Sequence, residues 1–370
     1  MQIPFVDLVK QYRSLKREID RAIQDVICDA AFIGGKYVEQ FEDSFARYCC
    51  AQYCVGVGNG TDAIYIALRA LGIGPGDEVI TVANSFIATS EAITMTGAKV
   101  VFVDCDEHTY NIDVRKIPDA ITSRTRAIVP VHLFGQPAAM WEIKKVAAEY
   151  GLFIVEDAAQ AHGAEIDGQR VGTFGDAACF SFFPGKNLGA YGDAGAIVTN
   201  NESLAVRCRM IANHGRIKKY DHEFEGINSR LDGLQASILH VKLAYLDSWI
   251  ESRRRHAKLY RELLANADLV VPEESLSVKH VYHLFVIRVQ NREAVQRFLK
   301  DNGISTGVHY PIPLPRLQAY RHLCYDPGAF PLATKYSEEI LSLPIYPELR
   351  NEEIEYVCDR LLQAVRSYKG

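Results

Sequence analysis

The residue of this sequence best suited to covalent chemistry is Lys186. It follows an apolar run, 177–182, that predicts a buried strand, and a glycine-rich stretch, 187–195, comes after it. A lysine amine can form a Schiff base with an aldehyde, and small neighbours let a flat ligand approach closely. An ordinary solvated lysine in a loop is the alternative interpretation, and this segment alone does not decide between the two.

A second candidate site is the turn at 58–61, between a predicted strand, 53–57, and a predicted helix, 61–70. Its glycines let backbone N–H groups point at an anion, the helix N-terminus favours negative charge, and the Thr61 hydroxyl adds a donor. A plain tight turn with a helix N-cap needs the same residue types. Both interpretations stay open at this point.

A third candidate is the carboxylate of Asp157, which comes directly after a very apolar predicted strand, 152–156. Burial of a carboxylate at the end of a buried strand costs free energy unless the carboxylate contacts a cation. A protonated pyridine nitrogen is such a cation. The alternative is a helix N-cap, with Gln160 three residues later as in a capping box. Together with Lys186 and the anion-binding turn, Asp157 matches the requirements of a pyridoxal phosphate (PLP) site.

The elements that must position these residues alternate between strand and helix, which predicts a mainly parallel sheet covered on both faces. In such sheets ligands gather at the carboxyl ends of the strands, where Lys186, Asp157 and the 58–61 turn all lie. The predicted strands are 53–57, 78–82, 99–103, 126–131, 152–156, 177–182 and 196–199, and helical patterns cover 11–29, 37–49, 61–70, 85–95 and 141–150.

The rest of the chain has an α+β pattern and is reached through a long helical pattern, 236–264. We therefore predict a large α/β domain over residues 1–245 and a smaller C-terminal α+β domain over 246–370. The elements expected in the smaller domain are a strand at 283–289, a helix at 292–302, a proline-punctuated stretch at 309–315 and a closing helix at 352–367.

Composition excludes several classes of protein. A formal net charge of −5 over 370 residues gives no general attraction to nucleic acid or to an anionic membrane. Every apolar run ends well short of the ~20 residues of a membrane span, and the N-terminus lacks the apolar core of a signal peptide. The nine cysteines are scattered without zinc spacing. We expect a cytoplasmic protein without a metal, nucleic acid or membrane partner.

Five motifs in order give the chain a specific resemblance: NGTDA from Asn59, PGDEVI from Pro75, EDAAQAHGA from Glu156, SFFPGKNLGAYGDAGA from Ser181 and GINSRLDGLQA from Gly226. The chain resembles the sugar aminotransferases of the DegT/DnrJ/EryC1/StrS family over nearly its whole length. That resemblance implies the aspartate aminotransferase fold of the type I PLP enzymes, with a mainly parallel seven-stranded sheet in the large domain.

The resemblance also implies roles for the residues around the cofactor ring. Lys186 is implied as the Schiff-base lysine and proton shuttle, with pyridoxamine phosphate as the intermediate form of the cofactor. Asp157 is implied to pair the pyridine nitrogen, Gln160 to contact the ring hydroxyl and Phe86 to stack on the ring face. Relatives that perform dehydration replace the lysine by histidine, so Lys186 argues against that branch.

The cofactor phosphate has its own implied contacts. Gly60, Thr61 and Ser181 are implied to hold it. Asn228 is implied to reach the phosphate of the partner subunit's cofactor, so the active unit would be a homodimer with active sites at the subunit interface.

The stretches 184–195 and 309–320 resemble the members that aminate the third carbon of a nucleotide-linked sugar. His309, Tyr310 and Phe183 are the candidate sugar contacts, and His162 is another. For His309 and Tyr310 the alternative is a proline-stiffened connection with packed aromatics. Arg230 and Lys218 are candidates for the substrate diphosphate, or else solvated charges.

The implied reaction transfers the amino group of L-glutamate to the third carbon of a dTDP-linked 3-keto-6-deoxyhexose, with ping-pong kinetics, and gives a dTDP-3-amino-3,6-dideoxyhexose. A UDP-linked 3-keto sugar acid is the first alternative substrate, and a 4-keto sugar is the second. A cofactor-bound regulator without turnover is an alternative of another class, and it predicts a missing lysine or aspartate. Lys186 and Asp157 are both present.

Overall fold

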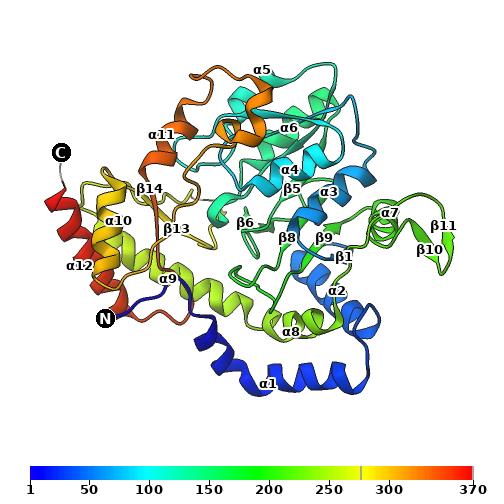
Figure 1. Ribbon diagram of the computed structural model, residues 1–370, viewed down its shortest axis with the longest axis horizontal. Coiled ribbons are helices and arrows are strands. Elements are labelled where there is room, and N and C mark those ends of the chain that lie inside the picture. The colour runs from blue at the N-terminus through cyan, green and yellow to red at the C-terminus, as the bar shows by residue number, and fades with distance from the viewer. Residues whose placement is uncertain (276, 369–370) are drawn as a thin grey trace.

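A seven-stranded sheet forms the centre of the computed structural model, which describes residues 1–275 and 277–368 (Figure 1). The strand order is β1-β9-β8-β5-β4-β2-β3, and every neighbouring pair is parallel except the two that β9 makes with β1 and β8. All seven predicted strands are in this sheet, so the α/β fold is confirmed. They are β1 (Tyr53–Val57), β2 (Glu78–Val82), β3 (Lys99–Val103), β4 (Thr125–Val129), β5 (Phe153–Asp157), β8 (Ala177–Ser181) and β9 (Gly195–Thr199).

Helices cover the sheet on both faces, because successive side chains of a strand point to opposite sides. In β9, Ile197 belongs to the hydrophobic cluster of one face, whereas Ala196 and Val198 belong to that of the other. Residues of α3, α4, α6 and α7 contribute to the first cluster, and residues of α2 and α8 to the second. The helices are α1 (Leu8–Cys28), α2 (Lys36–Cys49), α3 (Gly60–Ala70), α4 (Ile87–Met95), α5 (Ile117–Ala120), α6 (Met140–Tyr150), α7 (Glu202–Ala212) and α8 (Gly233–Leu243).

The prediction of one long helix over 236–264 is wrong, because the structure has two helices there. The helix is interrupted between α8 and α9 (Leu246–Leu264). Neither glycine nor proline stands at the break, so the sequence carries no signal for it. One tertiary contact and one local contact hold the Tyr245 side chain there. Its hydroxyl donates to Glu18 at 2.7 Å, and its ring stacks on Trp249.

A third hydrophobic cluster gathers around α9 and the C-terminal elements, and Ile3 belongs to it. Ile3 forms a parallel bridge with Ile304, so the two ends of the chain lie on the same side of the molecule (Figure 1). The division at residue 245 stays a prediction. The elements here are β13 (Phe285–Arg288), α10 (Arg292–Asp301), α11 (Pro331–Glu339), β14 (Ile340–Leu343) and α12 (Asn351–Ser367).

Short elements complete the fold, and among them the β10–β11 hairpin projects from the body beside α7 (Figure 1). No helix in the two described ranges is long and apolar enough to cross a lipid bilayer. The short strands are β6 (Glu165–Ile166), β7 (Gln169–Arg170), β10 (Arg216–Lys218), β11 (Asp221–His222) and β12 (Val278–Lys279).

Candidate active site

A cavity of about 950 Å³ opens where the carboxyl ends of the strands meet the C-terminal elements. Ten of the eleven predicted site residues lie on its wall, as expected when ligand groups follow parallel strands. The exception is Asn228, which is exposed and whose backbone pairs with Asn213. The ten are Gly60, Thr61, Phe86, Asp157, Gln160, Ser181, Phe183, Lys186, His309 and Tyr310.

The lysine lies in a tight turn directly after β8. Its backbone N–H donates to the Phe183 carbonyl oxygen at 2.8 Å, and a Cβ added to Gly189 would lie 2.2 Å from the Pro184 oxygen. The turn therefore closes only on a glycine. Burial lowers the pKa of the Lys186 amine to about 8, and the nearby Asp157 carboxylate opposes that shift. An amine with this pKa is a competent nucleophile and proton carrier near neutral pH.

The Asp157 carboxylate is 5% exposed and is held at both oxygens. Oδ2 accepts a hydrogen bond of 2.6 Å from the Thr89 hydroxyl, and Oδ1 accepts one of 3.2 Å from the Ala159 N–H. No helix begins after Asp157, so the N-cap alternative does not hold. Sequence reasoning missed Thr89, although it lies three positions after Phe86 in a predicted helix.

Gln160 connects the loop after β5 to the C-terminal part of the chain. Its Oε1 accepts from the Phe134 N–H at 2.6 Å, and its Nε2 donates to the Tyr310 hydroxyl oxygen at 3.1 Å. Burial and the Asp157 carboxylate raise the pKa of Tyr310, so its hydroxyl stays protonated. The Tyr310 ring lies 5.6 Å from the ring of Phe86.

Two aromatic side chains on the cavity wall are exposed to an unusual degree. Phe86 is 53% exposed and Phe183 is 57% exposed, whereas large aromatic side chains of a folded core are buried. Such rings on a cavity wall offer apolar faces to a flat ligand.

His309 is fixed by its Nδ1, which lies 2.8 Å from the Ser342 Oγ, and its ring stacks on Phe5.

The turn after β1 forms a cradle at the N-terminus of α3. The Asn59 side chain caps this helix by accepting from the Asp62 N–H at 2.8 Å, so the N-cap interpretation is correct. The cavity requires the glycine as well, because a Cβ on Gly60 would lie 2.7 Å from the Ser181 Cβ. Helix N–H groups beside the hydroxyls of Thr61 and Ser181 suit a phosphate.

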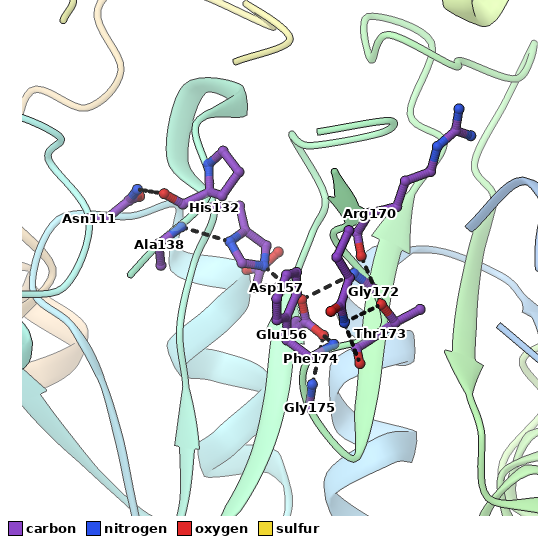
Figure 2. Close-up of polar contacts among 12 residues, drawn as sticks. Asn111, His132, Ala138, Glu156, Asp157, Arg170, Gly172, Thr173, Phe174 and Gly175 are labelled. Carbon is purple, nitrogen blue, oxygen red and sulfur yellow. Dashed lines mark hydrogen bonds and ion pairs between the residues drawn. The ribbon is translucent and has the colours of Figure 1, made fainter. Parts of the chain in front are cut away.

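A buried polar network lies behind Asp157 (Figure 2). Glu156 accepts three hydrogen bonds from backbone N–H groups of the loop 172–175 and faces the His132 Nε2 at 3.1 Å. Because the His132 Nδ1 accepts from the Ala138 N–H at 3.0 Å, Nε2 carries the proton and donates to Glu156. The His132 backbone N–H donates to the Asp157 carbonyl oxygen at 3.0 Å, so this network fixes the backbone of Asp157.

Three weaker candidates lie off the cavity wall. The expectation that His162 faces the sugar is wrong, because it is 0% exposed and its ring packs against Phe180 and Phe182. Burial lowers its pKa to about 3, so it is a neutral core histidine. Lys218 is exposed on β10, and Arg230 is half-buried near Asn228.

Comparison with known proteins identifies the family. The model of the DegT/DnrJ/EryC1/StrS aminotransferase family matches residues 13–362. This chain belongs to that family. It is 49% identical to the "Pleiotropic regulatory protein" of Geobacillus stearothermophilus over 100% of both chains. It is 47% identical, over 99% of both chains, to the dTDP-3-amino-3,6-dideoxy-alpha-D-galactopyranose transaminase of Aneurinibacillus thermoaerophilus.

Solved structures of relatives have the same fold. The crystal structure of S. venezuelae DesV in complex with a ketimine intermediate is 43% identical and has a TM-score of 0.96 over 98% of both chains. Aminotransferases of the DegT/DnrJ/EryC1/StrS family use PLP, and the cavity of this chain fits that group. Lys186 offers a nucleophilic amine, Asp157 an ionisable partner for a pyridine nitrogen, and the start of α3 a phosphate cradle. The protein is therefore a PLP-dependent sugar aminotransferase.

Proposed function

We propose that this protein transfers the amino group of L-glutamate to the third carbon of a dTDP-linked 3-keto-6-deoxyhexose. The product is a dTDP-3-amino-3,6-dideoxyhexose. The observation that carries the proposal is a buried amine with a pKa of about 8 on the same cavity wall as the buried Asp157 carboxylate. The choice of sugar is supported by the 47% identity to a transaminase of that product class.

PLP, when bound, withdraws electrons from the carbon that exchanges the amine. Lys186 would hold PLP covalently at rest, and its Nζ would carry the proton that moves between cofactor and substrate carbons. Its pKa of about 8 allows the amine to accept a proton in one step and donate it in the next. Asp157, aimed by Thr89, keeps the pyridine nitrogen protonated, and Gln160 contacts the ring hydroxyl.

Separate parts of the cavity wall bind the phosphate and the sugar. Gly60, Thr61 and Ser181 hold the cofactor phosphate at the N-terminus of α3, where N–H groups and the helix dipole favour an anion. The sugar lies against side chains of both parts of the chain. These are the proposed sugar contacts Phe183, His309 and Tyr310, with Phe86 stacked on the cofactor ring.

The active unit in this proposal is a homodimer. Asn228 does not line the cavity of its own chain and is exposed, which agrees with a contact to the cofactor phosphate of the partner subunit. We propose the cytoplasm as its location, because all nine cysteines are free thiols. Gel filtration with light scattering tests the dimer.

Absorbance spectroscopy of the purified protein with PLP tests the reaction. Addition of glutamate should bleach the cofactor band, and a single member of a panel of nucleotide-linked keto sugars should restore it. The panel contains dTDP-linked 3-keto and 4-keto hexoses and a UDP-linked 3-keto sugar acid, so the sugar that restores the band identifies the substrate.

The other outcomes of this experiment contradict the proposal. A bleached band that only another sugar restores replaces the proposed substrate by that sugar. A band that ignores glutamate indicates another amino donor or a regulator without turnover. Absence of a cofactor band in the wild type would contradict the role of Lys186, and a Lys186→Ala variant provides the reference spectrum.

A further inference from the structure

Arg253, in the middle of α9, lies on the wall of the same cavity and has no role in the proposed function. Its side chain is 4% exposed. Nη1 donates to three carbonyl oxygens, those of Tyr282 at 3.2 Å, His283 at 3.3 Å and Ile345 at 2.8 Å. Nε is buried and has no partner among the described residues. Nη2 makes no hydrogen bond to the described residues and is not among the fully buried atoms, so Nη2 is the nitrogen left for a ligand.

The Arg253 guanidinium is a buried cation that no carboxylate of the described residues contacts directly. Within residues 1–275 and 277–368, all of its hydrogen bonds go to carbonyl oxygens and none to a carboxylate. Burial lowers its pKa to about 10, against the field of Glu348, so it is still charged at neutral pH. Burial of an unpaired charge is costly, and a bound anion removes most of that cost.

Few side chains on the cavity wall carry a positive charge that could bind a substrate anion. The basic side chains on this wall are Lys186, Arg253 and two histidines. Burial lowers the pKa of His283 and of His309, so both imidazoles are neutral. The proposed function pairs Lys186 and Asp157 with the cofactor. Among the described wall residues, Arg253 is then the cation that remains for a substrate anion. The carboxylates on the wall are Asp62, Glu91, Asp157 and Asp193.

Arg253 and the reacting Lys186 lie on the wall of the same cavity, and His283 lies on that wall as well. His283, whose carbonyl oxygen it binds, has its pKa lowered first by burial and then by Lys186 and Arg253 in turn. The imidazole is thus within electrostatic reach of both cations.

We propose that Arg253 binds a carboxylate of the amino donor. The free Nη2 of a charged guanidinium suits a single carboxylate, whereas a nucleotide diphosphate needs several donors. This inference rests on the proposed function, because it assigns a subsite to the dicarboxylic donor of that reaction.

The test compares Arg253→Gln with wild-type holoenzyme in both half-reactions and uses glutarate, a dicarboxylate without an amine, as the binding probe. We expect the KM for glutamate and the Kd for glutarate to rise about 10- to 100-fold, as for the loss of a charge-assisted hydrogen bond. The half-reaction with the keto sugar should keep its wild-type rate and KM. The matched control is Arg254→Gln, since Arg254 donates to Glu274 and the His280 carbonyl, off the cavity wall.

Wild-type affinity of Arg253→Gln for glutarate would overturn the inference, and so would an equal loss in both half-reactions, which indicates a structural role. If Arg253→Gln does not fold, Arg253→Lys decides, because it keeps the charge and removes the Nη2 donor. Unchanged glutarate binding by Arg253→Lys then overturns the proposal. A wild-type enzyme that ignores both glutamate and glutarate contradicts the proposed donor itself. If the wild type responds to glutamate and glutarate and Arg253→Gln responds equally, only the role of Arg253 is contradicted.

Discussion

The Thr89 hydroxyl donates a hydrogen bond of 2.6 Å to the Oδ2 of Asp157, across 68 positions of sequence. It connects the helix that follows β2 with the carboxylate at the end of β5. The Ser85 hydroxyl lies 3.0 Å from the Thr89 Oγ1 and extends the chain of donors. A carboxylate held at both oxygens in this way keeps its orientation toward the cavity.

Thr89→Val tests this relationship, because it keeps the side-chain shape and removes the hydroxyl. We expect kcat to fall about 10- to 100-fold, the effect of losing one hydrogen bond to a charged group. Thr89→Ser should restore most of the rate, because it restores the donor. Steady-state kinetics measure both variants, and wild-type kcat in Thr89→Val would show that Asp157 does not need this donor.

Glu156→Gln tests the buried network behind the site (Figure 2). The amide replaces one carboxylate oxygen by an NH₂ group, which cannot accept the bonds from Gly172 and His132 if it lies on the Oε2 side. Two buried donors then lose their acceptor, and we expect the free energy of unfolding to fall by roughly 2 kcal/mol or more. Urea denaturation measures the change. A loss no larger than that of an exposed variant, Lys16→Gln, would contradict the importance of this network.

Gly60→Ala tests the phosphate cradle. The added Cβ would lie 2.7 Å from the Ser181 Cβ, so the start of α3 must move away from the cavity. We expect the Kd for PLP to rise about tenfold, which corresponds to the cost of modest overpacking. Gly74→Ala is the control, since its added Cβ would be 3.8 Å from its nearest neighbour. Equal PLP affinity of the two variants would contradict the requirement for glycine at position 60 of the phosphate cradle.

The lowered pKa of Lys186 predicts how apoenzyme captures PLP. Only the neutral amine reacts, so the capture rate should rise about tenfold per pH unit up to a midpoint near 8 and level off above it. Because the Asp157 charge opposes the shift, Asp157→Asn should move the midpoint to lower pH. Stopped-flow absorbance gives the profile, and a midpoint near the ordinary lysine value would contradict burial of the amine.

The sequence by itself determined the seven strands of the sheet and most of the cavity wall. Short apolar runs buried on both faces need no partner information to be recognised, and turn residues mark their ends. Because parallel strands share one carboxyl edge, Lys186, Asp157 and the 58–61 turn had to meet. The family motifs then supplied residues such as Phe86, which composition and periodicity favour as core.

Only the tertiary structure decided the contacts between distant segments. Thr89 and Arg253 read as ordinary helical residues in sequence, yet their partners lie 68 and up to 92 positions away. The break between α8 and α9 has no helix-breaking residue, and His162 proved to be a core side chain although it stands in a cofactor motif. The physical reason is that hydrogen-bond partners and burial are set by packing in three dimensions, which local propensity does not encode.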